Sequence, residues 1–140
     1  LVQANHGLRP WLRILGRPVG EAFPENRLKD RESGSIIVVL ATDAPLSGLS
    51  LRQIAKRAAI GIGRGGTPGG NSSGDIFLAL PVWEAGDGSR PLYLAAVEAV
   101  EEAVVNALVA GEDVATVKPP GQTVRAIDTD RLRRLFQPSA

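Results

Sequence analysis

The run Ser35–Ala41, with the sequence SIIVVLA, constrains the fold more than any other part of the chain. Its apolar, largely β-branched residues follow one another without polar alternation, a pattern typical of a strand covered on both faces. A small hydroxyl residue opens this strand directly after Gly34. One interpretation is a turn that ends at the edge of the strand. The other is that the Ser35 hydroxyl is a nucleophile.

The remaining apolar patterns predict helices packed against strands, a layered α/β or α+β arrangement. Leu94, Val97, Val100, Val104 and Leu108 recur at helical spacing. Ser50 is a plausible N-cap for a helix at 51–60, and Asp128 is a plausible N-cap for a short helix at 129–136. The expected elements are a strand end at 1–4, the strand at 35–41, a helix at 51–60, a strand at 76–82, a helix at 93–110 closed by Gly111, and a helix at 129–136.

Three segments predict no regular structure. The segment 8–26 carries three prolines among scattered apolar residues, so an irregular surface segment is expected. The segment 27–33 is highly charged and is expected to be exposed and mobile. The segment 84–91, EAGDGSRP, is typical of a turn.

Size and composition indicate one ordinary globular domain. The chain has 140 residues, a net charge of +1 and no cysteine, which excludes disulfides and thiolate chemistry and gives no general attraction to nucleic acid or anionic membranes. No apolar run is long enough to span a bilayer, and no signal-peptide pattern is present. The absence of methionine and the opening LVQANHG, which resembles the second half of a strand, favour the C-terminal part of a longer protein or a processed product.

The glycine-rich segment 61–75 contains a weak nucleotide motif. Gly61, Gly63 and Gly66 fit G-x-G-x-x-G, but that motif needs a strand before it and a helix after it, and here the expected order is reversed. No Gly-Lys-Ser/Thr follows, which excludes a P-loop. The segment ends in NSSGD, 71–75, which is either a structural turn or a group of polar side chains that orients another residue, with Ser35 the candidate.

A conventional serine triad does not fit the sequence. His6 is the only histidine, and beside a turn it is expected to be a surface or capping residue rather than a general base. No G-x-S-x-G elbow is present. Cleavage of the Gly34–Ser35 bond would give Ser35 a free α-amine with a reference pKa of about 7.7–8.0, close to working pH, and this amine could act as its general base.

The blocks LVQANHG, GRPVGE, GSIIVVLATDAPL, RAAIGIGRGGTPGGNSSGDIFLAL and TVRAIDTDRLRRLF resemble, in this order, the C-terminal part of the DmpA/BapA family of serine aminopeptidases. This resemblance implies an αββα sandwich, similar in architecture to N-terminal-nucleophile hydrolases and incomplete in this chain. It implies self-cleavage before Ser35, which divides the chain into 1–34, the tail of an α subunit, and 35–140, the β subunit of the same domain. It also implies an oxyanion role for Asn5, and a role for Ser73 and Asp75 in holding the nucleophile and the substrate amine.

The same resemblance implies a peptide, amide or ester substrate, no metal or organic cofactor, assembly with the N-terminal part of the precursor, and a homo-oligomer, commonly a tetramer. A cytoplasmic or periplasmic location is expected. The family's active-site tyrosine has no match here, since Tyr93 stands at a predicted helix start. Three alternatives stay open: an ornithine acetyltransferase-like enzyme, which calls for threonine rather than serine at position 35, a non-catalytic fragment, and a phosphate-binding glycine loop.

Overall fold

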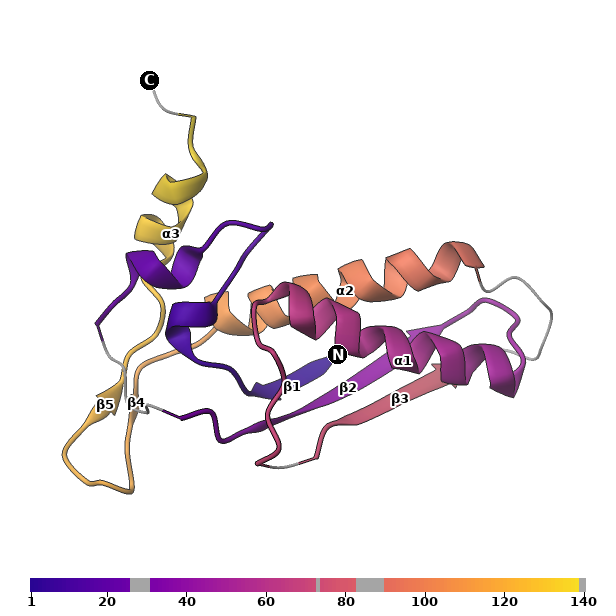
Figure 1. The fold of residues 1–140 in the computed structure, drawn as a ribbon, viewed down its shortest axis with the longest axis horizontal. Helices are drawn as coiled ribbons and strands as arrows, with labels where there is room; N and C mark the ends of the chain where they lie inside the picture. The colour runs from indigo at the N-terminus through magenta and orange to yellow at the C-terminus, as the bar shows by residue number, and fades with distance from the viewer. Residues whose placement is uncertain (26–30, 73, 83–89, 139–140) are drawn as a thin grey trace.

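The computed structural model describes residues 1–25, 31–72, 74–82 and 90–138. Its centre is a three-stranded sheet in the order β1-β2-β3, in which β1 is antiparallel and β3 parallel to β2. Two long helices lie side by side on one face of this sheet (Figure 1). The elements of this layer are β1 (Val2–Asn5), β2 (Ser35–Thr42), α1 (Gly48–Arg64), β3 (Ile76–Pro81) and α2 (Arg90–Val109).

Strand β2 is the central strand, as its apolar run predicts, but only one of its faces is covered. Ile36 and Val38 point toward the helices and are at most 1% exposed. They pack with residues of both helices, namely Ala58, Ile62, Val100 and Val104. The opposite face carries Ile37, 42% exposed, beside Ile76, Leu78 and Leu80 of β3, which are 43–59% exposed. The expectation of coverage on both faces is therefore wrong for this chain by itself.

Helix α1 begins earlier and ends later than the sequence pattern suggests. Its N-cap is Ser47, whose side chain accepts a hydrogen bond from the Ser50 N–H, so the assignment of Ser50 as the cap is wrong. The helix continues through Gly61 to Arg64 because α2 packs closely against it. A Cβ on Gly61 would lie 2.6 Å from the Val97 carbonyl oxygen. Gly61 and Gly63 therefore serve the helix and not a phosphate-binding loop.

Val97, Val100 and Val104 of α2 are buried, as predicted, and the last two pack on Ile36 and Val38 of the central strand. The helical spacing also predicts Leu94 on this face, but its side chain is 56% exposed. The helix ends before Gly111, whose N–H donates to the Leu108 carbonyl. Most of the predicted turn at 84–91, namely residues 84–89, lies outside the described residues. Its last two residues belong to α2, which begins at Arg90.

The rest of the chain forms a second, smaller cluster. The irregular segment contains two short 3-10 turns, η1 (Arg9–Trp11) and η2 (Val19–Ala22). It packs through Ile14, Val19 and Phe23 on Leu132 of helix α3 (Thr129–Phe136). Asp128 caps α3 as predicted, because its carboxylate accepts from the Arg131 N–H. A small hairpin, β4 (Val114–Ala115) and β5 (Thr123–Val124), precedes α3 (Figure 1).

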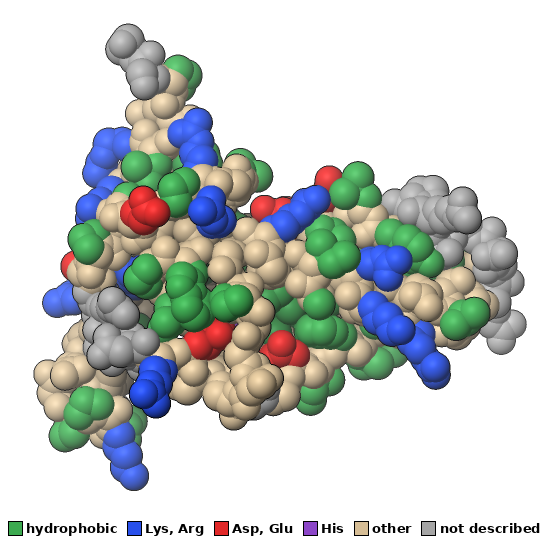
Figure 2. All heavy atoms as spheres, viewed as in Figure 1, with side chains coloured by type: hydrophobic (Ala, Val, Ile, Leu, Met, Phe, Trp, Pro, Cys, Tyr) green, Lys and Arg blue, Asp and Glu red, His purple; other side chains and the backbone are tan. Residues whose placement is uncertain are grey.

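The surface in Figure 2 shows Lys and Arg side chains over the outer side of α1 and around α3, interspersed with apolar and acidic ones. This mixed pattern on the visible face agrees with the net charge of +1. Among the described residues, no helix has the length and apolar character that a membrane crossing needs.

Candidate active site

Ser35 and Asn5 are directly opposite each other on neighbouring strands. Ser35 opens β2, Asn5 closes β1, and the antiparallel register pairs the two residues. Directly opposed side chains on such strands project from the same face with Cβ atoms about 4.5–5.5 Å apart. Strand alternation directs both side chains to the face away from the helices, since Ile36 points toward them. The two residues that the sequence analysis selected, 30 positions apart, are thus adjacent in space.

Gly34 lies so close to the backbone of Asn5 that a side chain at this position would clash with it. A Cβ at this position would lie 1.8 Å from the Asn5 carbonyl oxygen, far inside any real contact. The Gly34 N–H donates to the Ser72 Oγ at 3.1 Å. The peptide before Ser35 is therefore pressed against the backbone of Asn5 and tied to the end of the glycine-rich segment.

Asp75 lies just before β3, and its carboxylate reaches the backbone on the other side of Ser35. Its Oδ1 accepts a hydrogen bond from the Ile36 N–H at 3.2 Å. The Asp75 side chain is on the helix-side face, so it approaches the main chain at Ser35 rather than the face that carries the Ser35 side chain. Ser73, the other predicted residue of this block, lies outside the described residues.

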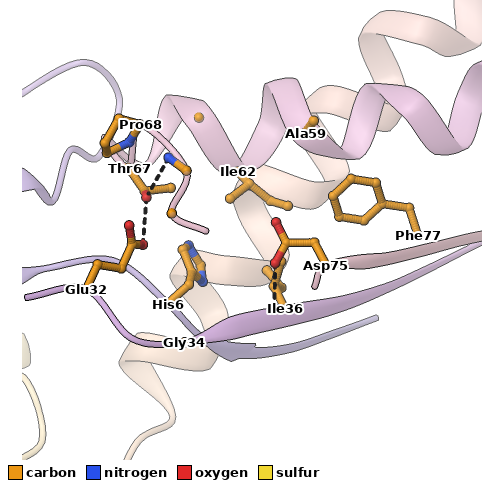
Figure 3. Close-up of a pocket in the computed structure, with 13 residues that line it drawn as sticks. His6, Glu32, Gly34, Ile36, Ala59, Ile62, Thr67, Pro68, Asp75 and Phe77 are labelled. Carbon is orange, nitrogen blue, oxygen red and sulfur yellow. Dashed lines mark hydrogen bonds between the residues drawn. The ribbon is translucent and has the colours of Figure 1, made fainter. Parts of the chain in front are cut away.

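A cavity of about 260 Å³ lies beneath this end of the sheet, between β2, the end of α1 and the glycine-rich segment. Figure 3 shows His6 inside it, between Glu32 and Asp75. Its apolar wall includes Ile62 and Phe77. His6 was expected to be a surface or capping residue, but it is half-buried, and its buried Nδ1 has no hydrogen-bond partner among the described residues. Since His6 lies on the face opposite to the Ser35 side chain, it is not placed to be the base for that hydroxyl.

Glu32 is the site residue that the sequence analysis missed. One oxygen of its carboxylate, Oε1, accepts from the Gly7 N–H at 2.7 Å and from the Thr67 Oγ1 at 2.9 Å. The segment 27–33 was expected to be exposed and mobile, but Glu32 is half-buried and fixed by these contacts, while residues 27–30 lie outside the described part. A charge-rich segment has no apolar periodicity, so only the position of Glu32, three residues before Ser35, could have drawn attention to it.

His6 makes the stability of the fold depend on pH. Burial lowers its pKa from the ordinary value of 6.5, and the nearby Glu32 and Asp75 carboxylates only partly oppose this. The unfolded chain therefore binds a proton more readily than the folded one, and folding stability falls as pH drops below about 6.5. We expect the urea midpoint to decrease from pH 7.5 to pH 5.5, and the decrease to become smaller in His6→Gln.

The other described group with a shifted pKa, Asp113, does not contribute between pH 5.5 and pH 7.5. Hydrogen bonds from the Ala126 N–H and from Arg125 lower its pKa below 3.8, so its titration lies outside the tested range. An equal decrease in the urea midpoint of His6→Gln and of the unsubstituted protein would show that His6 is not the group responsible.

Comparison with known proteins places this arrangement in a family. A model of peptidase family S58 matches residues 1–121. The chain belongs to peptidase family S58. A curated relative, the β-peptidyl aminopeptidase BapA of Sphingosinicella microcystinivorans, is 38% identical over 98% of this chain and 42% of its own length. The BapA of Sphingosinicella xenopeptidilytica is 35% identical over 98% and 41%. The S58 chain thus spans about two fifths of the curated relatives it matches.

Two solved structures resemble the S58 chain along nearly all of its length. The L-aminopeptidase D-Ala-esterase/amidase of Ochrobactrum anthropi is 47% identical with a TM-score of 0.79, covering 96% of this chain and 41% of that one. It is described as a prototype for the serine aminopeptidases and a variant of the Ntn hydrolase fold. A β-aminopeptidase of Burkholderia sp. is 39% identical with a TM-score of 0.74, covering 99% and 44%. The predicted family and fold class are confirmed.

Proposed function

We propose that the protein containing this chain is a self-processing serine aminopeptidase or amidase. The observation that carries the proposal is the position of Ser35, the first residue of the central strand, opposite Asn5 and directly after a glycine pressed against the Asn5 carbonyl. The relatives' names support the same chemistry, since they are aminopeptidases, one of them also an esterase and amidase. They favour it over the acetyltransferase and the phosphate-binding module.

The proposed self-cleavage begins with attack of the Ser35 Oγ on the Gly34 carbonyl carbon. The C–N bond to Ser35 breaks, the acyl group passes from nitrogen to oxygen, and water hydrolyses the resulting ester. This leaves a carboxylate on Gly34 and a free α-amine on Ser35. Residues 1–34 and 35–140 would then belong to two polypeptides of one domain.

In the mature enzyme, the Ser35 hydroxyl attacks the carbonyl carbon of the substrate's first residue, and the α-amine of Ser35 takes the hydroxyl proton. The bond from that carbonyl to the leaving amine or alcohol breaks, the leaving group receives the proton, and the substrate's first residue stays on Ser35 as an ester. Water then gives a proton to the α-amine and hydrolyses this ester, which releases the residue and restores the Ser35 hydroxyl.

The α-amine of Ser35 is fixed close to its own hydroxyl and has a reference pKa of about 7.7–8.0, so little orientation is needed. Asp75 already accepts from the next backbone N–H, which supports a role in orienting that amine. Ser73 is proposed to assist Asp75. The substrates proposed from the relatives' names are N-terminal residues of peptides, amides or esters, β-peptides included.

The uncovered face of the sheet supports assembly with further chain segments. Ile37, Ile76, Leu78 and Leu80 form an exposed apolar surface on the side that carries Ser35. Such a surface on a sheet is typical of a face that another layer covers. We propose that a second sheet from the remainder of the precursor covers it. We also propose, from the family resemblance, that the mature protein is a homo-oligomer, commonly a tetramer in this family. No metal or organic cofactor enters this mechanism.

The proposal is tested by intact-mass analysis and N-terminal sequencing of the full-length purified protein. We expect two polypeptides, the second beginning at Ser35, together with hydrolysis of amino-acid p-nitroanilides. A single intact polypeptide that hydrolyses these amides at full rate would exclude the mechanism.

Asn5→Ala is expected to lower kcat about 10²- to 10³-fold, because one oxyanion donor contributes that much in comparable sites. The side chain of Asn5 is exposed and its strand pairing uses the backbone, so the melting temperature should change little. The measurement is kcat on an amino-acid p-nitroanilide with already cleaved enzyme. Gln3→Ala, on the same face of β1, is the control and should keep its activity. Full turnover in Asn5→Ala would remove the oxyanion role.

A further inference from the structure

Glu32 connects three segments that meet at the Gly34–Ser35 bond. It stands three residues before Ser35, in the segment that leads into β2. Its Oε1 binds the Gly7 N–H, two residues after Asn5, and the Thr67 hydroxyl, in the loop after α1. Figure 3 shows the Glu32 carboxylate directed at Thr67 on the edge of the cavity.

The loop 67–70, which contains Thr67, packs closely against the Glu32 carboxylate. The Thr67 Oγ1 also accepts from the Gly69 N–H at 3.2 Å, and Gly69 has a φ of +80° that favours glycine. A Cβ on Gly70 would lie 3.0 Å from the Glu32 Oε2. The turn that Thr67 closes therefore brings its backbone within contact of Glu32, and a larger residue at position 70 would push against it.

The backbone on the two sides of Ser35 is held in different ways. After Ser35, strand β2 pairs with β1 and β3, and Ile36 is also tied to Asp75. Before Ser35, the chain is not part of the sheet, and the Glu32 side chain supplies two of its connections to neighbouring segments. Attack on the Gly34 carbonyl needs that carbon held within about 3–3.5 Å of the Ser35 Oγ, and a misplacement of 1 Å costs about 10²-fold in rate.

We propose that Glu32 is a positioning residue for self-cleavage, acting through the hydrogen bonds that its carboxylate accepts from Gly7 and Thr67. This inference rests on the proposed function, since it concerns the cleavage step of that same site. Glu32 fixes the segment 32–34 against residues 5–7 and the glycine-rich loop, and so presents the Gly34 carbonyl to Ser35. It takes no proton and touches no substrate.

The test follows cleavage of the full-length precursor, made by cell-free synthesis with a labelled amino acid and then chased. We expect Glu32→Ala to slow cleavage about 100-fold. Glu32→Gln, whose amide oxygen can still accept both hydrogen bonds, should be slowed much less. Thr67→Val loses the hydroxyl donor and should be slowed about tenfold, whereas Thr67→Ser restores the hydroxyl and should cleave within about twofold of the unsubstituted protein.

Two controls separate positioning from stability. Glu25→Ala removes another carboxylate from the same half of the chain, one paired at 2.9 Å with Arg131 of α3, and should leave the cleavage rate unchanged. The melting temperature of each variant is measured in a Ser35→Ala background, in which every sample is expected to stay uncleaved. Once cleaved, Thr67→Val enzyme should keep its kcat/KM within about threefold, because the contact acts before the mature enzyme exists.

Cleavage of Glu32→Ala at the unsubstituted rate would overturn the inference. A second result would also overturn it: cleavage rates that fall only in proportion to the loss in melting temperature, with Thr67→Ser cleaving as slowly as Thr67→Val. That result would indicate that the contact only stabilises the fold. Failure of the unsubstituted precursor to cleave, or undiminished cleavage in Ser35→Ala, would contradict the proposed function itself. The two failures are therefore distinguishable in the same experiment.

Discussion

Ser35→Ala is expected to leave the precursor in one piece and to abolish hydrolysis of amino-acid amides. In the proposed mechanism, alanine removes the Oγ that attacks the Gly34 carbonyl, and without that cleavage residue 35 has no free α-amine to act as a base. Loss of the nucleophile costs on the order of 10⁶-fold in kcat in a serine peptidase, so no turnover above background should remain. Intact mass reports the first effect and release of p-nitroaniline the second.

The fold should survive this substitution, because Ser35 pairs with Asn5 through its backbone. Ser47→Ala is the matched control. It removes the hydroxyl that caps α1 and is expected to cost about 1 kcal/mol of stability while cleavage and turnover stay intact. Ser35→Thr keeps a hydroxyl at the same position and should retain measurable cleavage. A Ser35→Ala protein that is still cut between Gly34 and residue 35 would show that another group performs the cleavage.

The central strand and the main helices could be predicted because their signals are local. Continuous β-branched residues marked β2, and apolar spacing marked α2. The end of α1 could not be predicted in this way, because Gly61 resembles a helix terminator unless one knows that α2 packs against it. The apolar run of β2 also predicts that other elements cover both of its faces. In the described chain helices cover one face only, and Ile37 on the other face is exposed.

The candidate site was predictable in part for a similar reason. Ser35, Asn5 and Asp75 stand in motifs that a resemblance can identify, and the structure brings the first two together and sets the third on the adjoining backbone. Glu32 belongs to no such motif. Its proposed role depends on Gly7 and Thr67, which lie 25 and 35 residues away and meet Glu32 only in the folded chain.

Gly34→Ala is expected to prevent self-cleavage and to destabilise the fold. The added Cβ would lie 1.8 Å from the Asn5 carbonyl oxygen and 2.8 Å from its carbon, and both are backbone atoms that cannot rotate away. Real contacts of this kind do not fall below 3.0 Å, so Asn5 and the Gly34 peptide must separate by more than 1 Å. A shift of that size costs at least about 10²-fold at a reacting centre, and overpacking costs typically 1–3 kcal/mol of stability.

The measurements are the fraction of precursor cleaved over time and the melting temperature, the latter in a Ser35→Ala background. Gly48→Ala is the control, because a Cβ there meets nothing within 4 Å at the start of α1, and stability should stay equal or rise slightly. Because the clash is with Asn5 itself, the displacement moves the proposed oxyanion residue and the scissile carbonyl apart. Normal cleavage in Gly34→Ala would therefore mean that neither the contact between them nor the register of β1 on β2 governs the reaction.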